Sequence, residues 1–287
     1  MKKVAILTMD SLEEFECYDR VLDKPMQEAG WHTTHVPWKK SDVNWNSFDV
    51  VVIRSTWDYQ NDPDKFFSVI ETIDASSARL ENSINLVRWN INKSYLKELE
   101  SKGILIVPSL WFGQFSLELI KGSYQKYHVD EIVIKPLVSA NADNTFRLDA
   151  ATLNTSIKEL EKIFSSTEFV VQPFIKSVVE KGEYSVFYFN EIYSHCILKT
   201  PKKGDFRVQE EHGGVLTSIK PHSGLLEASQ KVFYALPEMP LYARVDLVEI
   251  NGAFALMEIE LIEPSLYFNM DTHSAERFVS AFVERCG

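Results

Sequence analysis

The sequence contains little cysteine, with only Cys17, Cys196 and Cys286 among 287 residues. No two of them have the short spacing of a zinc site, and three scattered thiols do not make a disulfide framework. A cysteine-zinc site and a disulfide-stabilised secreted fold are therefore excluded, and a reducing cytoplasm is the expected compartment.

Long apolar runs are also missing. The N-terminal stretch MKKVAILTMD has two lysines and an apolar run, but Asp10 ends that run too early for a signal peptide. No other stretch approaches the roughly 18 consecutive apolar residues that span a bilayer. We therefore expect no membrane partner and interpret the N-terminal run as a first β-strand.

Basic residues are too few for a nucleic-acid surface. The chain has 30 Lys and Arg against 41 Asp and Glu, a net charge of -11 and a pI near 5.2. Since a phosphate backbone is usually bound by a basic face, nucleic acid is not an expected partner.

The glycine patterns GxxxxGK[ST] and GxGxxG are absent as well, so a bound nucleotide would have to be held by other means.

The chain does have an ordinary globular composition, 45% hydrophobic, and a readable order of elements. VAILTM predicts a buried strand, the apolar spacing from Glu13 to Ala29 predicts an amphipathic helix, and HTTHVPW and DVVVIR predict two further strands. This order predicts an open α/β sheet, whose ligand crevice normally lies at the carboxyl ends of its strands. Those ends carry Asp10, Ser11, Thr56, Trp57, Asp58 and Tyr59.

The rest of the chain divides into a mixed block and a block rich in strands. A helix over 93–101, a strand over 104–109 and the strand EIVIKP precede LVSANADNT, whose composition is typical of a loop. From residue 169 consecutive strands dominate, with predicted turns at Asn190-Glu191 and Asn251-Gly252, and a helix over 274–283 closes the chain. We predict an α/β (α+β) fold with an N-terminal open α/β domain (1–90), a small central unit (91–167) and a mainly antiparallel C-terminal unit (168–287).

Acidic residues inside apolar strands give the first functional indication. Glu258 and Glu260 lie two residues apart in ALMEIELIE, so their side chains share one face of a strand. Asp246 lies on the preceding strand, and like charges on adjacent strands are unfavourable without a counter-ion. Such oxygen ligands suit Mg²⁺, and Arg244, on the face of Asp246, would stabilise negative charge beside it. The alternative is a strand pair whose charges face solvent.

Two lysines are candidates for phosphate binding. Lys135 ends the strand EIVIKP directly before the polar loop, where its ammonium group would meet a phosphate that the loop covers. A solvated lysine at a strand end is the ordinary alternative. Lys93, at the start of a predicted helix, is a weaker candidate of the same kind.

The order of these pieces resembles the ATP-grasp family over nearly the whole chain. The matching pieces are, in order, Lys93, VIKP with Lys135, the small-residue loop, VQPFI, GEYSV with Glu183, GDFRVQEEHGG with Arg207, ARVD with Arg244 and Asp246, and LMEIELIEP. The resemblance is to the glutathione synthetase and D-alanine:D-alanine ligase side of the family. RSTWDY and EIELIEPSLY look most like the bacterial branch that includes the cyclo-ligase of cycloserine biosynthesis. An ATP-grasp architecture, with the central unit as a lid, is what this resemblance implies.

The resemblance also implies ligands for ATP and its metal. The residues implied to bind the ATP phosphates are Lys93, Lys135, Ser139, Asn141 and Thr145. Those implied at the adenine hinge are Gln172, Phe174 and Ile175, and Glu183 is implied to bind the ribose hydroxyls. For Mg²⁺, or Mn²⁺ in its place, it implies Asp246, Glu258 and Glu260. Two features depart from the family pattern: Glu260 stands where the family usually has Asn, and the phosphate-covering loop SANADNT has no glycine.

The activity implied by the resemblance is ATP-dependent ligation. A carboxylate of an amino acid or small peptide-like acid would become an acyl phosphate and then be joined to an amine, with release of ADP and phosphate. Arg207 and Arg244 would be catalytic, and substrate contacts are expected at the strand ends of the first unit and at His212 and Gly213. The expected partners are small-molecule carboxylates and amines, with a homodimer as the common assembly. The alternatives are a phosphotransferase on the same scaffold and a non-catalytic nucleotide-binding regulator.

Overall fold

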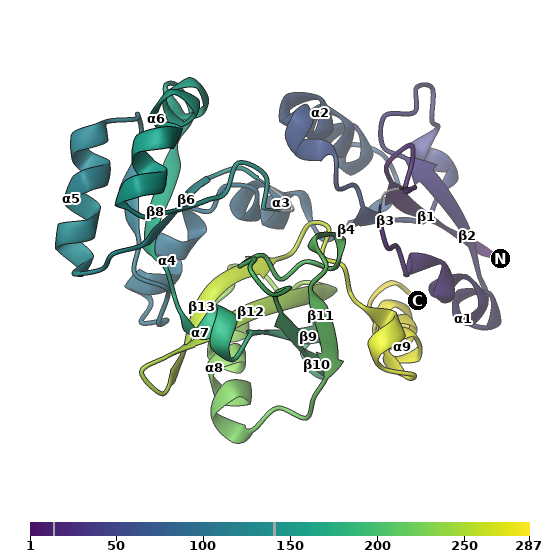
Figure 1. The fold of residues 1–287 in the computed structure, drawn as a ribbon. Helices are drawn as coiled ribbons and strands as arrows, with labels where there is room; N and C mark the ends of the chain where they lie inside the picture. The colour runs from purple at the N-terminus through teal and green to yellow at the C-terminus, as the bar shows by residue number, and fades with distance from the viewer. Residues whose placement is uncertain (14, 140–141) are drawn as a thin grey trace.

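A computed structural model describes residues 1–13, 15–139 and 142–287, and these residues form three β-sheets, each from a different stretch of the chain. Figure 1 shows the corresponding three units, with the first in purple and blue, the second in teal and the third in green and yellow. None of the helices in the described part of the chain is long and apolar enough to cross a membrane.

The first sheet is parallel throughout, with the strand order β2-β1-β3-β4. Its elements are β1 (Lys2–Thr8), α1 (Asp23–Glu28), β2 (Trp31–Pro37), β3 (Val50–Ser55), α2 (Pro63–Asp74) and β4 (Arg79–Glu81). Successive residues of β3 enter different cores, since Ile53 packs with Phe66 of α2 and Val52 packs with Met26 of α1. A strand buried on both faces has a continuous apolar sequence, and the predicted open α/β sheet is confirmed.

The predicted helix from Glu13 to Ala29 is wrong. α1 is far shorter and follows a 3₁₀ turn at Asp19–Leu22. Phe15 packs beside Trp57 in the core on the α2 side of the sheet, whereas Leu22 and Met26 belong to the core on the opposite side. Because these apolar residues serve two cores, they never form one helical stripe.

The second sheet is antiparallel, with the strand order β5-β8-β6-β7. Its elements are β5 (Leu110–Phe112), α5 (Leu117–Tyr127), β6 (Ile132–Pro136), β7 (Phe146–Leu148), α6 (Ala150–Phe164) and β8 (Phe169–Pro173). Ile120 of α5 and Phe164 of α6 share a core with Ile134 of β6. β8 begins just after the predicted boundary at residue 168 but pairs with β5 and β6, so the hydrogen bonding of this sheet crosses that boundary.

The third sheet is also antiparallel, with the order β11-β10-β9-β12-β13. Its unit contains α7 (Ser177–Glu180), β9 (Glu183–Phe189), β10 (Ile192–Thr200), β11 (Val215–Ser218), α8 (Ser223–Tyr234), β12 (Tyr242–Ile250) and β13 (Ala253–Glu260). Two earlier helices, α3 (Ile84–Asn90) and α4 (Tyr95–Ser101), share its core through Leu86 and Leu96. Asn251 and Gly252 have φ values of 51° and 81°, which confirms the predicted hairpin turn between β12 and β13.

The predicted strand over 104–109 is wrong. This segment makes an isolated bridge, in which Ile106 pairs with Leu256 and Val107 N–H donates to Leu256 O over 3.0 Å. Pro108 then follows, and without an N–H group it cannot extend the ladder.

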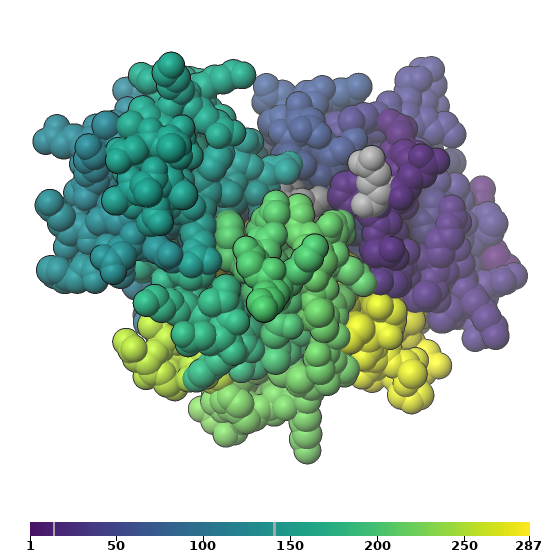
Figure 2. Space-filling model, viewed as in Figure 1, coloured from purple at the N-terminus to yellow at the C-terminus, as the bar shows by residue number. Residues whose placement is uncertain are grey.

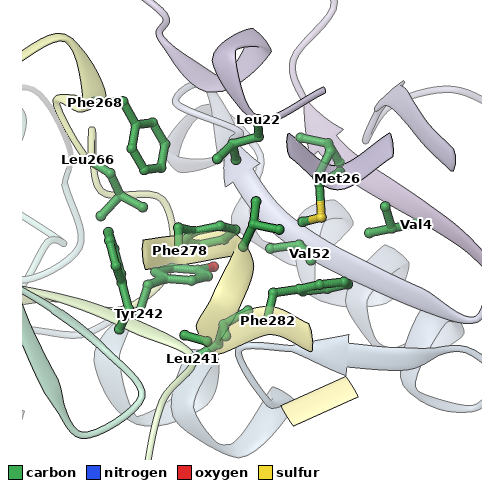
Figure 3. Close-up of a cluster of buried hydrophobic side chains, with 14 of the residues drawn as sticks. Val4, Leu22, Met26, Val52, Leu241, Tyr242, Leu266, Phe268, Phe278 and Phe282 are labelled. Atoms are coloured by element: carbon green, nitrogen blue, oxygen red, sulfur yellow. The ribbon is translucent and has the colours of Figure 1, made fainter. Parts of the chain in front are cut away.

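The C-terminal helix α9 (Ser274–Cys286) joins the first unit to the third. Figure 3 shows Phe278 and Phe282 among side chains from α1, β3 and β12, including Met26, Val52 and Tyr242. This shared core joins one face of the first sheet to strands β9 and β12 of the third sheet. In the space-filling view the third unit, in green, lies against both the second unit, in teal, and the first unit, in purple (Figure 2).

Candidate active site

All three units contribute described residues to a cavity between them. The predicted residues that line it are Trp57, Tyr59, Lys93, Lys135, Ser139, Thr145, Gln172, Phe174, Ile175, Glu183, Arg207, Arg244, Asp246, Glu258 and Glu260. Asn141 lies outside the described residues. The fold therefore brings together, at one place, the side chains that the sequence assigned to ATP, metal and catalysis.

The other predicted substrate residues are not brought to this cavity. Asp10, Ser11 and Gly213 are exposed elsewhere, and Thr56 is fully buried. Asp58 accepts a hydrogen bond from Trp38 Nε1 over 2.6 Å and pairs with Lys39, which gives it a structural role. His212, at the end of a 3₁₀ turn at Glu210–His212, also lies outside the lining.

Cross-strand register builds the acidic centre of the cavity. Arg244 of β12 faces Glu260 of β13, and Asp246 faces Glu258, so the four side chains form two adjacent pairs. The Arg244 guanidinium bonds both Asp246, with Nε 3.0 Å from Oδ2, and Glu260. Arg244 is thus the positive group that separates the carboxylates of Asp246 and Glu260.

Two buried lysines complete this charge network. Lys93 Nζ lies 3.0 Å from Glu258 Oε1 and donates to the carbonyl of Ser139 over 2.9 Å, which ties the loop after β6 to the acidic centre. Lys199 Nζ lies 2.6 Å from Glu183 Oε1 and 3.4 Å from Asp246 Oδ1. Sequence reasoning missed Lys199, although a lysine in the apolar strand HCILKT was an available signal.

The electrostatics of the three carboxylates differ. Burial opposes ionisation of Asp246 and Glu258, but Arg244 lowers the pKa of Asp246 and Lys93 lowers that of Glu258. Burial is the main cause that raises the pKa of Glu260 to about 7. The charge of Arg244 lowers this pKa, and the charges of Asp246 and Glu258 raise it. Arg244 and Lys93 therefore favour the ionised forms of Asp246 and Glu258, whereas burial favours the neutral form of Glu260.

The donor chemistry of this centre suits a hard cation. Carboxylate oxygens are the ligands that Mg²⁺ takes, and three of them lie on one face of two paired strands. Among the described residues, however, no three acidic, cysteine or histidine side chains are gathered in an arrangement that would hold a metal. Arg244 and Lys93 are the present partners of these carboxylates, so a metal would have to displace ion pairs.

Among the described cations that line the cavity, Lys135 is the one without an ion-pair partner. Its side chain is buried, and no described carboxylate forms an ion pair with it; its ammonium group lies 3.9 Å from the sulfur of Met257. Burial lowers the pKa of Lys135, and the nearby charge of Glu258 offsets this lowering only in part. A buried cation is costly unless it is paired, so this position favours an anionic ligand.

The end of β8 and the two residues after it, Gln172 to Ile175, form one side of the cavity. Gln172 Nε2 donates to Ser109 Oγ over 2.9 Å, and Phe174 N–H donates to Glu131 O over 3.0 Å. The Arg147 guanidinium lies over the Phe174 ring, with Cζ 3.7 Å from the ring centroid. These contacts fix the backbone of the predicted hinge, so a flat ligand would meet a rigid edge there.

Arg207 and Glu183 are both held by ion pairs. The Arg207 side chain is 38% exposed and pairs with Asp205 over 2.8 Å, which also raises the pKa of Arg207. Glu183 is buried and its carboxylate bonds to Lys199. A catalytic contact of Arg207 and a ribose contact of Glu183 therefore remain predictions.

The segment after β13, which we call the anchored segment (residues 261–266), is fixed by its carbonyl groups. Six consecutive carbonyls accept hydrogen bonds from side chains, namely Leu261 from Asn82 (2.7 Å), Ile262 from Tyr242 (2.9 Å), Glu263 from Trp57 (2.8 Å), Pro264 from Arg54 (2.8 Å), Ser265 from Arg244 (3.3 Å) and Leu266 from His195 (3.0 Å). Irregular backbone is thereby satisfied without a strand partner. The side chains of Glu263 and Ser265 line the cavity.

His195, which anchors one end of this segment, is expected to make the fold acid-sensitive. Burial lowers the pKa of His195 to about 4 from its ordinary 6.5, and Nε2 must carry the proton that it donates to Leu266 O. As pH falls from 6.5 to 4, the unfolded chain gains a proton that the folded chain refuses, so the free energy of unfolding drops by up to about 3 kcal/mol. Urea unfolding across this range should show that His195→Gln, which keeps an N–H donor, loses less stability than the wild type.

The matched control for this experiment is the exposed His32. His32→Gln should follow the wild-type acid profile. Equal losses of stability in the wild type and in His195→Gln would contradict the role of the buried ring.

Comparison with known protein families gives two matches along the chain. Residues 4–82 match the family described as D-cycloserine synthetase DcsG, N-terminal domain, and residues 118–270 match prokaryotic glutathione synthetase, ATP-grasp domain. The cycloserine biosynthesis protein DcsG of Streptomyces lavendulae is 27% identical over 273 residues, covering 86% of this chain and 87% of that protein.

Solved structures share the fold over the full length. The crystal structure of D-cycloserine synthetase DcsG has a TM-score of 0.88 at 24% identity and covers 99% of this chain and 100% of that one. D-alanine–D-alanine ligase from Bacillus anthracis has a TM-score of 0.71 at 14% identity, covering 100% of this chain and 97% of that one.

Proposed function

This chain belongs to the prokaryotic glutathione synthetase type of the ATP-grasp family, and on that premise we propose that it is a carboxylate–amine ligase working through an acyl phosphate. The observation that carries the proposal is Lys135, a buried cation without an ion-pair partner among the described residues, in the same cavity as the carboxylates of Asp246, Glu258 and Glu260. Such a site is suited to a polyanion that arrives with a divalent cation.

The phosphates of ATP are assigned to Lys135 and Lys93. Lys93 already joins Glu258 to the Ser139 carbonyl, so a phosphate that draws Lys93 away would also change how the loop after β6 is held. The adenine is assigned to the rigid edge at Gln172–Ile175. There Phe174 N–H already donates to Glu131 O, and Ile175 O already accepts from Val178 N–H over 3.0 Å. The Ile175 N–H, which has no acceptor among the described residues, is left to read the base.

Mg²⁺, or Mn²⁺ in its place, would be held by Asp246, Glu258 and Glu260, and when bound it would offset the charge of the phosphates and orient them. The side chains of the protein then have separate tasks. Lys135 and Lys93 would neutralise phosphate charge, and Arg244 would stabilise the negative charge that develops on the oxygen atoms of the reacting carboxyl group.

The proposed reaction has two steps. A substrate carboxylate oxygen forms a bond to the γ-phosphorus as the bond to the ADP oxygen breaks, which gives an acyl phosphate and ADP. The amine nitrogen then forms a C–N bond to the carbonyl carbon, the C–O bond breaks and inorganic phosphate leaves with its electron pair, and the nitrogen gives up one proton to water. Both partners are small molecules, and three cysteines without disulfides suit a cytoplasmic enzyme.

An amino-acid or small peptide-like acid is the substrate class we favour. The match of residues 4–82 to the N-terminal domain of a D-cycloserine synthetase supports it, since that unit supplies Trp57 and Tyr59 to the cavity. This match also favours ring closure within one molecule as a form of the same ligation.

Release of ADP and inorganic phosphate tests the proposal. Mg-ATP is offered with pooled amino acids, hydroxy acids and dipeptides, beside Asp246→Asn as the control, and products are identified by mass spectrometry. Equal, pool-dependent release of ADP and phosphate that is lost in the control supports ligation, and a product lighter by one water identifies the bond. ADP without free phosphate would indicate a phosphotransferase, and ATP binding without turnover a non-catalytic regulator.

A further inference from the structure

Glu263 differs from the other buried carboxylates of the cavity. Its residue is 9% exposed and lines the cavity, yet in the described part of the chain its carboxylate makes neither an ion pair nor a hydrogen bond. The buried carboxylates of Asp246 and Glu183 and the half-buried carboxylates of Glu258 and Glu260 all have cationic partners: Asp246 and Glu260 bond Arg244, Glu258 bonds Lys93 and Glu183 bonds Lys199. Residues 1–13, 15–139 and 142–287 thus supply no ion-pair partner for Glu263.

The backbone at Glu263 is nevertheless fixed on both sides. Its own carbonyl accepts from Trp57 Nε1 over 2.8 Å, and the next carbonyl, of Pro264, accepts from Arg54 Nη2 over 2.8 Å. Arg54 is itself buried and paired with Asp19 over 2.9 Å. The first unit of the chain therefore holds this carboxylate in place through main-chain contacts that do not use its charge.

Aromatic residues from the same unit line the cavity with Glu263. Trp57 and Tyr59 are both buried, and the Glu263 charge is among the causes that raise the pKa of the Tyr59 hydroxyl, after burial. Aromatic rings attract cations as carboxylates do, so an ammonium group suits a cavity that is lined by Trp57, Tyr59 and Glu263.

We infer that Glu263 binds the ammonium group of the substrate, so that the enzyme takes a zwitterionic amino acid and rejects the same acid without its amine. This inference deepens the proposed function, on which it rests. Among the described residues, Lys135 and Glu263 are then the buried amino group and the buried carboxyl group of the cavity without an ion-pair partner. The first would be matched by phosphate, and the second by the amino group of the acid that phosphate activates.

The electrostatics of Glu263 agree with a missing cation. Burial raises the pKa of Glu263 to about 8, and the nearby charges of Glu260 and Glu258 raise it further than Lys93 and Arg244 lower it. A bound ammonium group would restore the ionised carboxylate at neutral pH.

Paired ligands with and without an amine test the inference. The probes are D- and L-serine and D- and L-alanine, each compared with 3-hydroxypropionate or propionate. Binding is measured by calorimetry with Mg²⁺ and a non-hydrolysable ATP analogue, and turnover by ADP release. We expect the wild type to favour the amino acid by about 10- to 100-fold and Glu263→Gln to lose that preference while its affinity for the nucleotide is unchanged.

Glu211→Gln is the matched control, because Glu211 lines the same cavity but is exposed; this variant should keep the preference. Equal binding of both ligands by the wild type, no binding of any amino acid, or a preference that persists in Glu263→Gln would each overturn the inference. Binding of amino acids through Glu263 without ADP release would leave the inference standing and refute the ligase.

Discussion

Arg244→Ala is expected to lower kcat by about two to three orders of magnitude, with the KM for ATP nearly unchanged. The guanidinium lies buried between Asp246 and Glu260, beside the position where the acyl phosphate and its oxyanion would form. Loss of one preorganised donor to such a charge costs about 2.7–4 kcal/mol of transition-state stabilisation. Rates of ADP release at saturating substrate, with ATP varied, measure both constants.

Two further variants separate catalysis from folding in this experiment. Arg244→Lys keeps the charge but loses the planar fork that bonds two carboxylates, so it should recover only part of kcat. Arg207→Ala removes an exposed guanidinium that Asp205 already holds, and a smaller loss is expected. Thermal unfolding of each variant shows whether the chain is still folded. Wild-type turnover in folded Arg244→Ala would refute the role.

The acidic centre was predictable because it depends on local geometry. Side chains two residues apart share a face of a strand, and the turn at Asn251-Gly252 places the strand of Asp246 beside that of Glu258. No longer-range information was needed for the positions of these side chains. The cations that surround these side chains come from other strands, and for that reason Lys199 of β10 was missed.

The anchored segment was beyond the reach of sequence patterns. Its hydrogen bonds join residues far apart in the chain, such as Arg54 with Pro264 and Asn82 with Leu261, and no periodicity records such pairs. The helix predicted from Glu13 failed for a similar reason, since periodicity cannot tell that apolar residues divide between two cores. Glu263, whose position depends on these contacts, therefore had no signal in the sequence alone.

Lys135→Met is expected to move stability and activity in opposite directions. In the protein without ligand, Lys135 is a buried ammonium group that no described carboxylate pairs, and its lowered pKa reflects the cost of burying that charge. An apolar side chain of similar length removes this cost and contacts Met257, so the free energy of unfolding should rise by about 1 kcal/mol or more. The same change removes the group assigned to the ATP phosphates, so kcat/KM for ATP should fall by about 100-fold or more.

Urea unfolding with and without Mg-ATP measures both effects on one protein. At a nucleotide concentration of about 100 Kd, the wild type should gain about 2.7 kcal/mol of stability from the ligand, and Lys135→Met should gain little. Lys97→Met is the control, because Lys97 is a surface lysine stacked on Trp111 outside the cavity, and it should keep the full gain. A Lys135→Met protein that is less stable than the wild type and still gains from Mg-ATP would show that this lysine supports the fold and does not bind phosphate.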